Sequence, residues 1–118
     1  MATHSYRRIV LYRNSRVEVV RIIWPPCIAS LPHDHGTSYG IIKVISGAIF
    51  QDIFSKKTKR FIEHSRHGKD EILFETPDVI HIMGNPSKKK AAETIHIYSP
   101  RLAMTYYKKE DLKYLKRR

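Results

Sequence analysis

The sequence predicts an all-β fold, closed as a small barrel or sandwich. Short stretches rich in Val, Ile and aromatic residues recur along most of the chain, and these residue types favour strands. Turn-forming residues separate the stretches, as at Ser46-Gly47 and Gly84-Asn85-Pro86. Many short strands at this spacing are typical of β-sandwiches and barrels. With 118 residues, the chain is expected to form a single domain, residues 1–118, around one core.

The expected strands follow one another with little else between them. The first two form a hairpin around Arg13-Asn14-Ser15, and Pro25-Pro26 ends the second because proline cannot donate a ladder hydrogen bond. The eight expected strands are Tyr6 to Tyr12, Arg16 to Trp24, Tyr39 to Ile45, Ala48 to Phe54, Arg60 to His64, Glu71 to Glu75, Val79 to Met83 and Thr94 to Tyr98.

Only the C-terminal segment departs from this pattern. Between Lys109 and Lys116, acidic residues come early and basic residues late, which matches the helix dipole. Leu112 and Leu115 lie at helical spacing. We therefore expect a short C-terminal helix.

The charge is strongly positive, with a formal net charge of +11, and would attract polyanions or anionic small molecules. The basic residues gather at the expected turns Ser55 to Arg60 and Ser87 to Lys90 and in the segment Lys108 to Arg118. No nucleic-acid-binding motif accompanies them. We expect solvated loops rather than a nucleic-acid partner, and an anionic small substrate remains compatible with the charge.

Targeting and redox features favour the cytoplasm. The first residues contain no apolar signal-peptide segment, and no later apolar run has the length of a membrane span. We therefore expect a soluble protein with no membrane partner. The single cysteine, Cys27, cannot form an internal disulfide, which fits a reducing compartment.

Histidines at two places in the chain suggest a metal site. His33 and His35 are separated by one residue, so on a strand they share a face and can offer two imidazole nitrogens to one ion. Such pairs also occur as hydrogen-bonded strand residues, so the pair alone leaves both interpretations open. His81, His96 and Tyr98 lie on later expected strands. If the strands close into a small barrel, inward side chains from several strands meet in one pocket.

Five ordered landmarks resemble the cysteine dioxygenase family of the cupin superfamily. They are Tyr6-x-Arg8, Trp24 ahead of Pro32-His33-Asp34-His35, the pair Gly40 and Gly47, His81-x-x-x-Asn85, and Thr94-x-His96-x-Tyr98-Ser99-Pro100. The first histidine pair with the two glycines has the spacing of the first cupin motif, and the fourth landmark resembles the end of the second motif. The match runs from Tyr6 to about Tyr106. It implies a small cupin β-barrel, also called a double-stranded β-helix or jelly roll.

The resemblance implies a mononuclear, non-haem Fe(II) bound by His33, His35 and His81. Neutral imidazoles suit iron, and three of them leave three positions of an octahedron open. Nickel or zinc is expected as a substitute in crystals, because nitrogen ligands bind these ions more tightly than Fe(II).

The resemblance also implies an oxidoreductase that adds both atoms of O2 to the sulfur of a small thiol. L-Cysteine, oxidised to cysteine sulfinate, is the first substrate expected, which would place the enzyme in cysteine metabolism. Another thiol acid, such as 3-mercaptopropionate, is the alternative within this class. A cupin that binds metal without turnover, as a sensor or binding module, is the alternative outside it.

Substrate-binding and catalytic roles follow residue by residue from the same resemblance. Arg8 would pair with the substrate carboxylate through two parallel hydrogen bonds, helped by Tyr6 and Tyr98. His96 would orient Tyr98. Thr94 stands where the family usually has serine and keeps the hydroxyl, so these three residues, at i, i+2 and i+4, can form a hydrogen-bonded relay. From the residues alone, Arg7 competes with Arg8 for the inward face.

The chain departs from the family pattern at several points. Gly40 stands where the general cupin motif has a metal-binding glutamate, a carboxylate that thiol dioxygenases also lack. Some animal members have a cysteine at this position, and it crosslinks to the tyrosine. Because Gly40 has no sulfur, Tyr98 is expected to be unmodified. The helical region that precedes the first strand in the family has no counterpart ahead of Arg8. The resemblance also suggests a cis peptide bond at Ser99-Pro100.

Overall fold

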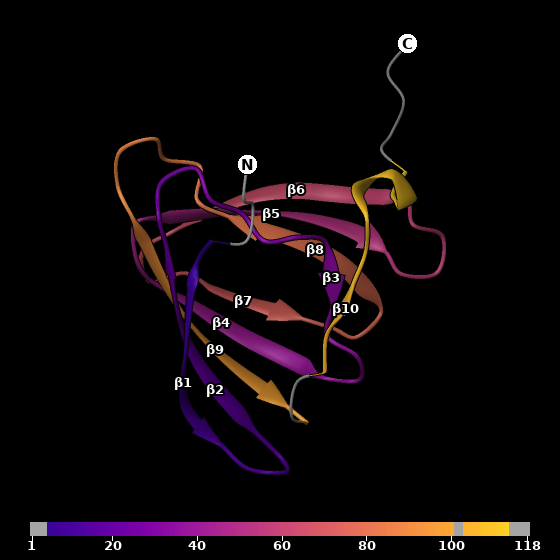
Figure 1. Cartoon of the computed structure of the whole chain (residues 1–118), viewed down its shortest axis with the longest axis horizontal. Coiled ribbons are helices and arrows are strands. Elements are labelled where there is room, and N and C mark those ends of the chain that lie inside the picture. The colour runs from indigo at the N-terminus through magenta and orange to yellow at the C-terminus, as the bar shows by residue number, and fades with distance from the viewer. Residues whose placement is uncertain (1–4, 101–102, 114–118) are drawn as a thin grey trace.

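The structure, a computed structural model, describes residues 5–100 and 103–113 and consists of two five-stranded antiparallel sheets that face each other (Figure 1). The first sheet has the order β1 (Arg7–Arg13), β2 (Glu18–Trp24), β9 (Ala92–Ser99), β4 (Tyr39–Ser46) and β7 (Ile72–Glu75). The second has the order β10 (Thr105–Tyr106), β3 (His33–Asp34), β8 (Val79–Gly84), β5 (Ala48–Ser55) and β6 (Phe61–Gly68). This is the expected jelly roll, in which β3, β4 and β5 pass from one sheet to the other and back.

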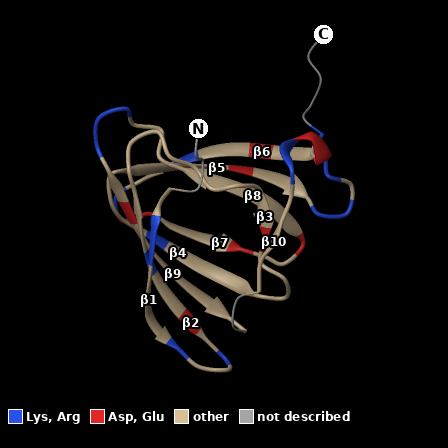
Figure 2. Ribbon diagram, viewed as in Figure 1, with Lys and Arg blue, Asp and Glu red and all other residues tan. Residues whose placement is uncertain are grey.

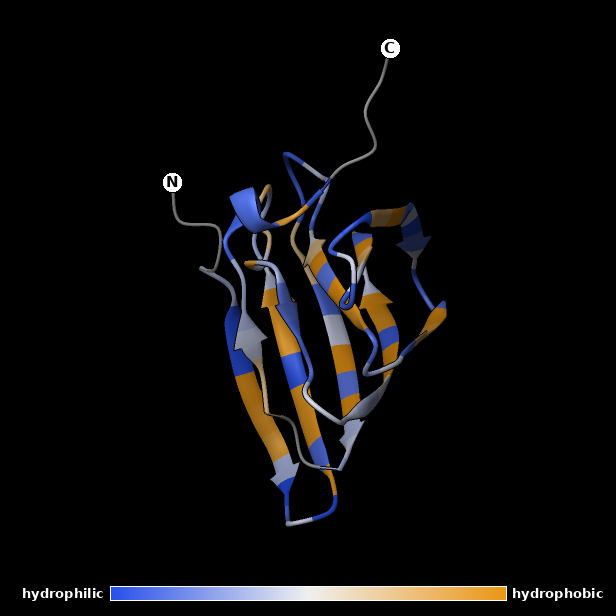
Figure 3. Ribbon diagram, turned by 90° about the vertical axis from the view of Figure 1, so that its right-hand side faces the viewer, coloured by the Kyte–Doolittle hydropathy of each residue, from blue (hydrophilic) through white to orange (hydrophobic). Residues whose placement is uncertain are grey.

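All eight expected strands are confirmed, and on β2, β4, β7 and β9 the side chains alternate between the core and the outer face of the sheet. On β4, Ile42 and Val44 are fully buried, whereas Tyr39 and Ile41 are exposed. Figure 3 shows this alternation as orange and blue bands along the strands. The period of two puts one apolar face of each strand against the opposite sheet. The two short strands β3 and β10 were not predicted, because two residues carry no periodic pattern.

The core has two parts. The larger contains the residues Val20, Ile22, Trp24, Ile42, Val44, Ile49, Leu73, Met83, Ala92 and Tyr98. The smaller contains Phe54, Ile80, Ile82 and Leu112. Aromatic and polar residues of β2 and β9 therefore lie directly against the main core, which fixes their positions.

The expected C-terminal helix is wrong for the part of the tail that the structure describes. Lys109–Asp111 form only a 3-10 turn, after which Leu112 has extended backbone and packs into the smaller core. The Lys113 amide then donates to the carbonyl oxygen of Lys59. An isolated helix of this length is marginal in water, so burial of one leucine and pairing of the backbone outweigh the helical pattern. The rest of the predicted helix, residues 114–116, lies outside the described residues.

The loop after β3 is held by a tight turn. Gly36 has φ +64°, and a Cβ atom there would lie 2.6 Å from the Ala103 carbonyl oxygen, so only glycine fits. The Gly36 amide donates to Asp34 Oδ1 at 2.8 Å. At the end of β9, the Ser99-Pro100 bond is cis, as the family resemblance suggested.

Within the described residues, no helix is long and apolar enough to span a bilayer. The lysines and arginines lie in several loops and also within strands, as Arg21 on β2 and Lys43 on β4 do (Figure 2).

Candidate metal centre

Three buried histidines converge where β3 meets β8. His33 lies on β3, and His35 is the first residue after that strand. His81 lies opposite His33 in the β3–β8 pairing. One nitrogen from each residue lies within 4.8 Å of the others. All three predicted metal ligands are therefore brought together by the pairing of two strands.

Hydrogen bonds at Nδ1 fix the orientation of the His33 and His81 rings. His33 donates its Nδ1 proton to the Leu31 carbonyl oxygen at 2.7 Å. His81 donates its Nδ1 proton to Gln51 Oε1, on β5, at 2.8 Å. In both rings the Nε2 lone pair is then free for a metal ion.

The distance between the ligand atoms fits a metal ion. The Nε2 atoms of His35 and His81 lie 3.0 Å apart. Two nitrogens bound at right angles, each about 2.1 Å from one ion, would be separated by about 3.0 Å. At this distance the two nitrogens either share a proton in a hydrogen bond or hold a cation between their lone pairs. The donor set of three imidazoles is one that iron, zinc, copper and nickel accept.

The protonation state of the histidines also suits metal binding. Burial lowers the pKa of His33, His35 and His81 to about 3 in each case, and for the first two the neighbouring His81 adds to the effect. Near neutral pH the imidazoles therefore carry no charge and keep their lone pairs.

A buried carboxylate, Glu75 at the end of β7, lies behind two of the ligands. Its Oε1 is 3.1 Å from Nδ1 of His35, and its Oε2 is 2.8 Å from Nδ1 of His81. The distances are those of hydrogen bonds, but neither oxygen has the alignment of one. Burial raises the Glu75 pKa to about 7, and the adjacent His35 opposes the shift.

A hydrogen-bonded chain runs along β9 beside the histidines. His96 Nδ1 lies 2.7 Å from the Tyr98 hydroxyl, and His96 Nε2 lies 2.7 Å from the Thr94 hydroxyl. The indole N–H of Trp24 donates to the same Thr94 oxygen at 3.0 Å. The predicted three-residue relay is thus present in the geometry, with Trp24 as a fourth member. The Tyr98 ring lies close to the candidate metal ligands, its centroid 4.9 Å from that of His35 and its plane tilted by 58°.

Burial sets the charge of the relay. It moves the pKa of His96 well below its usual value and that of Tyr98 well above. Both side chains are therefore neutral near pH 7, so they can pass or hold a proton without carrying a fixed charge.

Arg8, rather than Arg7, faces the pocket. Arg7 is exposed, whereas Arg8 is partly buried and lines the cavity. One guanidinium nitrogen of Arg8 donates to Glu18 Oε2 at 3.1 Å, and Arg13 donates to the same oxygen at 2.7 Å. Although burial opposes it, these hydrogen bonds hold the Glu18 pKa below its usual value. Arg8 and Arg13 together carry two positive charges and Glu18 carries one negative charge. This group, which lies at the arginine wall of the pocket, therefore keeps a net charge of about one positive unit.

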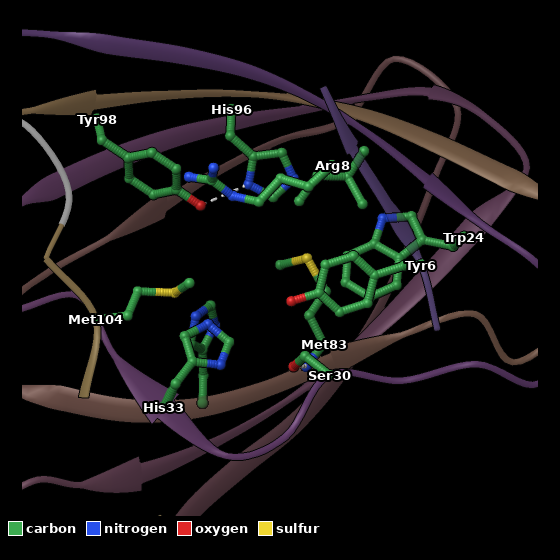
Figure 4. Close-up of a pocket in the computed structure, with 11 residues that line it drawn as sticks. Tyr6, Arg8, Trp24, Ser30, His33, Met83, His96, Tyr98 and Met104 are labelled. Carbon is green, nitrogen blue, oxygen red and sulfur yellow. Dashed lines mark hydrogen bonds between the residues drawn. The ribbon is translucent and has the colours of Figure 1, made fainter. Parts of the chain in front are cut away.

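Two of the three histidines, two members of the predicted relay and Arg8 line one small cavity of about 20 Å³ (Figure 4). In this view Tyr98, His96 and Arg8 lie on one side, and His33 and Met104 lie on the other. The lining residues are Tyr6, Arg8, Ile22, Trp24, Ser30, His33, His81, Met83, His96, Tyr98 and Met104. The lining combines polar groups with apolar side chains such as those of Ile22 and Met83.

Comparisons with known proteins decide the family. The model for cysteine dioxygenase type I matches residues 2–109. The chain belongs to the cysteine dioxygenase type I family. Family membership and the three-histidine centre together support a metal-dependent thiol dioxygenase.

Solved structures with low sequence identity share the fold of this cysteine dioxygenase family member. A double-stranded β-helix protein from Klebsiella pneumoniae matches with a TM-score of 0.71 and 15% identity, over 92% of this chain and 90% of that one. An RmlC-like cupin from Methanocaldococcus jannaschii matches with a TM-score of 0.67 and 15% identity, over 82% of each chain. A protein from Thermus thermophilus matches with a TM-score of 0.69 and 16% identity, over 80% of this chain and 83% of that one.

Several residues around the site of this family member were not predicted. Asn85 was a landmark of the family motif, and it proves to hold a loop: its amide donates to the carbonyl oxygens of Trp24 and Lys90. Glu75, Gln51 and Met104 carry no motif, so their positions depend on strand pairing. The period of two places Glu75 on the same face as Leu73, and this alternation was the one available signal.

The pKa values of the ligands predict how the metal-free protein responds to acid. A histidine has a pKa of about 6.5 in an unfolded chain, and these three have values of about 3 in the fold. Between these values the unfolded chain binds more protons, so the free energy of unfolding falls as pH falls from about 6.5 towards 3. The raised pKa of Glu75 acts in the opposite direction, but one carboxylate opposes three imidazoles.

Urea unfolding of the metal-free protein between pH 7.5 and pH 5 checks this expectation. The midpoint urea concentration should decrease steadily on acidification. A midpoint that stays constant or increases would contradict the assignment of three buried, neutral imidazoles.

Proposed function

We propose that this protein is an Fe(II)-dependent dioxygenase that adds both atoms of O2 to the sulfur of a small thiol, with L-cysteine converted to cysteine sulfinate. The observation that carries the proposal is the meeting of three neutral imidazoles and the Tyr98 relay at one cavity, in a chain of this family. We further propose that the protein acts in the cytoplasm, as its single cysteine suggests.

The donor set supports iron as the resident metal. His33, His35 and His81 would hold the ion through Nε2, and nickel or zinc would compete for the same nitrogens. Iron(II) at this centre supplies the redox chemistry between the thiolate sulfur and dioxygen. Because the three ligands are neutral, an anionic thiolate is the natural additional partner for a dication.

Arg8 would bind the carboxylate of the substrate. Its guanidinium donates to Glu18 through one nitrogen, which anchors the side chain while other N–H groups remain available. The wall keeps a net positive charge because Arg13 shares the same carboxylate. An amino acid thiol or a thiol acid such as 3-mercaptopropionate has a carboxylate that would pair with this positive charge. L-Cysteine is our first choice. Tyr6, which packs on Trp24 with ring centroids 4.7 Å apart, would close the same end of the pocket.

The relay would present the Tyr98 hydroxyl proton to the substrate. Trp24 can only donate, so its indole N–H occupies one lone pair of the fully buried Thr94 hydroxyl. The Thr94 proton is then satisfied by donation to His96 Nε2, which leaves the His96 proton on Nδ1, facing Tyr98. The Tyr98 oxygen accepts that proton, so its own proton points elsewhere, into the cavity. This direction suits hydrogen bonding to a carboxylate or to developing negative charge on oxygen.

A binding module without turnover is the second candidate, and the net charge of +11 is the observation that favours it. The basic residues are spread over several loops and strands (Figure 2) and no nucleic-acid-binding motif accompanies them, which supports small-molecule chemistry rather than a nucleic-acid or membrane partner. The partners that we propose are therefore a small thiol and O2.

Oxygen uptake tests the proposed activity. Protein loaded anaerobically with Fe(II) is mixed with O2 and either L-cysteine or 3-mercaptopropionate, and sulfinate is measured by mass spectrometry. We expect about one sulfinate formed for each O2 consumed, and the ratio of the two rates ranks the thiols.

Two variants control this experiment. His81→Ala removes a metal ligand and should abolish uptake, whereas His64→Ala removes an exposed histidine on β6 and should leave it unchanged. Tight metal binding without oxygen consumption on either thiol would contradict the dioxygenase. Salt-sensitive binding to nucleic acid would then favour the binding module.

Replacing Tyr98 with phenylalanine tests the relay. Tyr98→Phe removes the hydroxyl that faces the cavity but keeps the ring packed near His35, so metal content should stay constant. A positioned proton donor contributes about 100-fold or more to the rate, and we expect kcat to fall by at least that factor. Tyr39→Phe, on the exposed face of β4, is the matched control. Steady-state kinetics that match those of the wild type would exclude Tyr98 from the mechanism.

A further inference from the structure

Glu75 is a buried carboxylate without a hydrogen-bond partner among the described residues. It is 4% exposed, and both of its oxygens are enclosed. Its two close neighbours, at 3.1 Å and 2.8 Å, are the Nδ1 atoms of His35 and His81. Burying an unpartnered carboxylate costs free energy. Here the unpartnered carboxylate lies beside two candidate metal ligands. Its negative charge therefore points to a bound cation as the compensating charge.

The geometry places the carboxylate on the far side of the rings from the metal. His35 and His81 approach each other through Nε2, at 3.0 Å, while Glu75 contacts both rings at Nδ1. Glu75 belongs to the first sheet, and both histidines lie on or next to strands of the second. One side chain thus reaches across from the opposite sheet to two ligands at once.

Gly40 leaves room for this arrangement. Gly40 is the direct partner of Glu75 in the pairing of β4 with β7. A Cβ atom at position 40 would lie 3.6 Å from the Glu75 Cβ and 3.0 Å from the Tyr98 ring. The absence of a side chain there lets Glu75 and Tyr98 lie side by side behind the histidines.

We propose that Glu75 is a positioning residue for the metal: its carboxylate lies against the Nδ1 atoms of His35 and His81, attracts their N–H groups electrostatically, and supplies the negative charge that three neutral imidazoles lack. The Nε2 lone pairs are thereby held towards the ion. Partners of this kind orient a ligand and raise its basicity. The inference rests on the metal site of the proposed function and not on its thiol chemistry.

The test compares Zn(II) affinity in Glu75→Gln and the wild type, measured by competition with a chromophoric chelator. Glutamine keeps the size of the side chain but removes its charge. We expect affinity to fall about 10- to 100-fold, the usual effect of losing such a partner. Glu63→Gln, an exposed site on β6 with the same change in net charge, should bind Zn(II) as the wild type does. Glu75→Asp keeps the charge and should recover part of the lost affinity.

Urea unfolding of the metal-free variants separates positioning from folding. Because an amide is less costly to bury than a carboxylate, metal-free Glu75→Gln should be at least as stable as the wild type while it binds zinc more weakly. Affinity within threefold of the wild type would overturn the inference. A loss of metal-free stability that accompanies the weaker binding would also overturn it, by assigning Glu75 to folding. If the wild type binds zinc tightly, these failures leave the proposed function standing. A wild type that binds no metal would overturn both.

Discussion

The pairing of β3 with β8 is the constraint on which the rest of the site depends. It sets His33 opposite His81 and places His35 two residues further along the chain, inside the protein, where burial keeps all three imidazoles neutral. A bound cation would satisfy the lone pairs of all three rings at once. Metal binding would therefore be linked to the stability of this arrangement.

The two sheets contribute different halves of the chemistry. The metal ligands belong to the second sheet, whereas the Thr94, His96 and Tyr98 relay and the pocket arginine belong to the first. Close packing of the two sheets brings these halves to one cavity. Trp24 serves both purposes, because its ring fills the main core while its indole N–H fixes the direction of the relay. A core residue can thus set the direction of the hydrogen-bonded chain that ends at the Tyr98 hydroxyl.

The sequence was sufficient to predict the strands, because they depend on short, regular spacings. The resemblance to the family identified the three histidines and the relay residues that the fold brings together. Contacts between distant strands were harder to predict. On β7, the hydrophobic residues Ile72 and Phe74 are 55% and 73% exposed, while Leu73 and Glu75 point inward. Hydrophobicity therefore favours the wrong face, and the burial of Glu75 becomes evident only when the partner strand is known. The prediction of a C-terminal helix was wrong for a similar reason, because the contacts of Leu112 with residues distant in the sequence outweigh the local helical pattern.

The most direct test of the central claim is the metal content of the wild type and of three single variants, His33→Ala, His35→Ala and His81→Ala. Equilibrium dialysis against Fe(II) under anaerobic conditions, with His64→Ala as the control, gives the number of ions bound per chain. The account predicts about one ion for the wild type and the control and a large loss of binding in each ligand variant, because three neutral nitrogens are needed together. Full metal content in any of the three variants would contradict it.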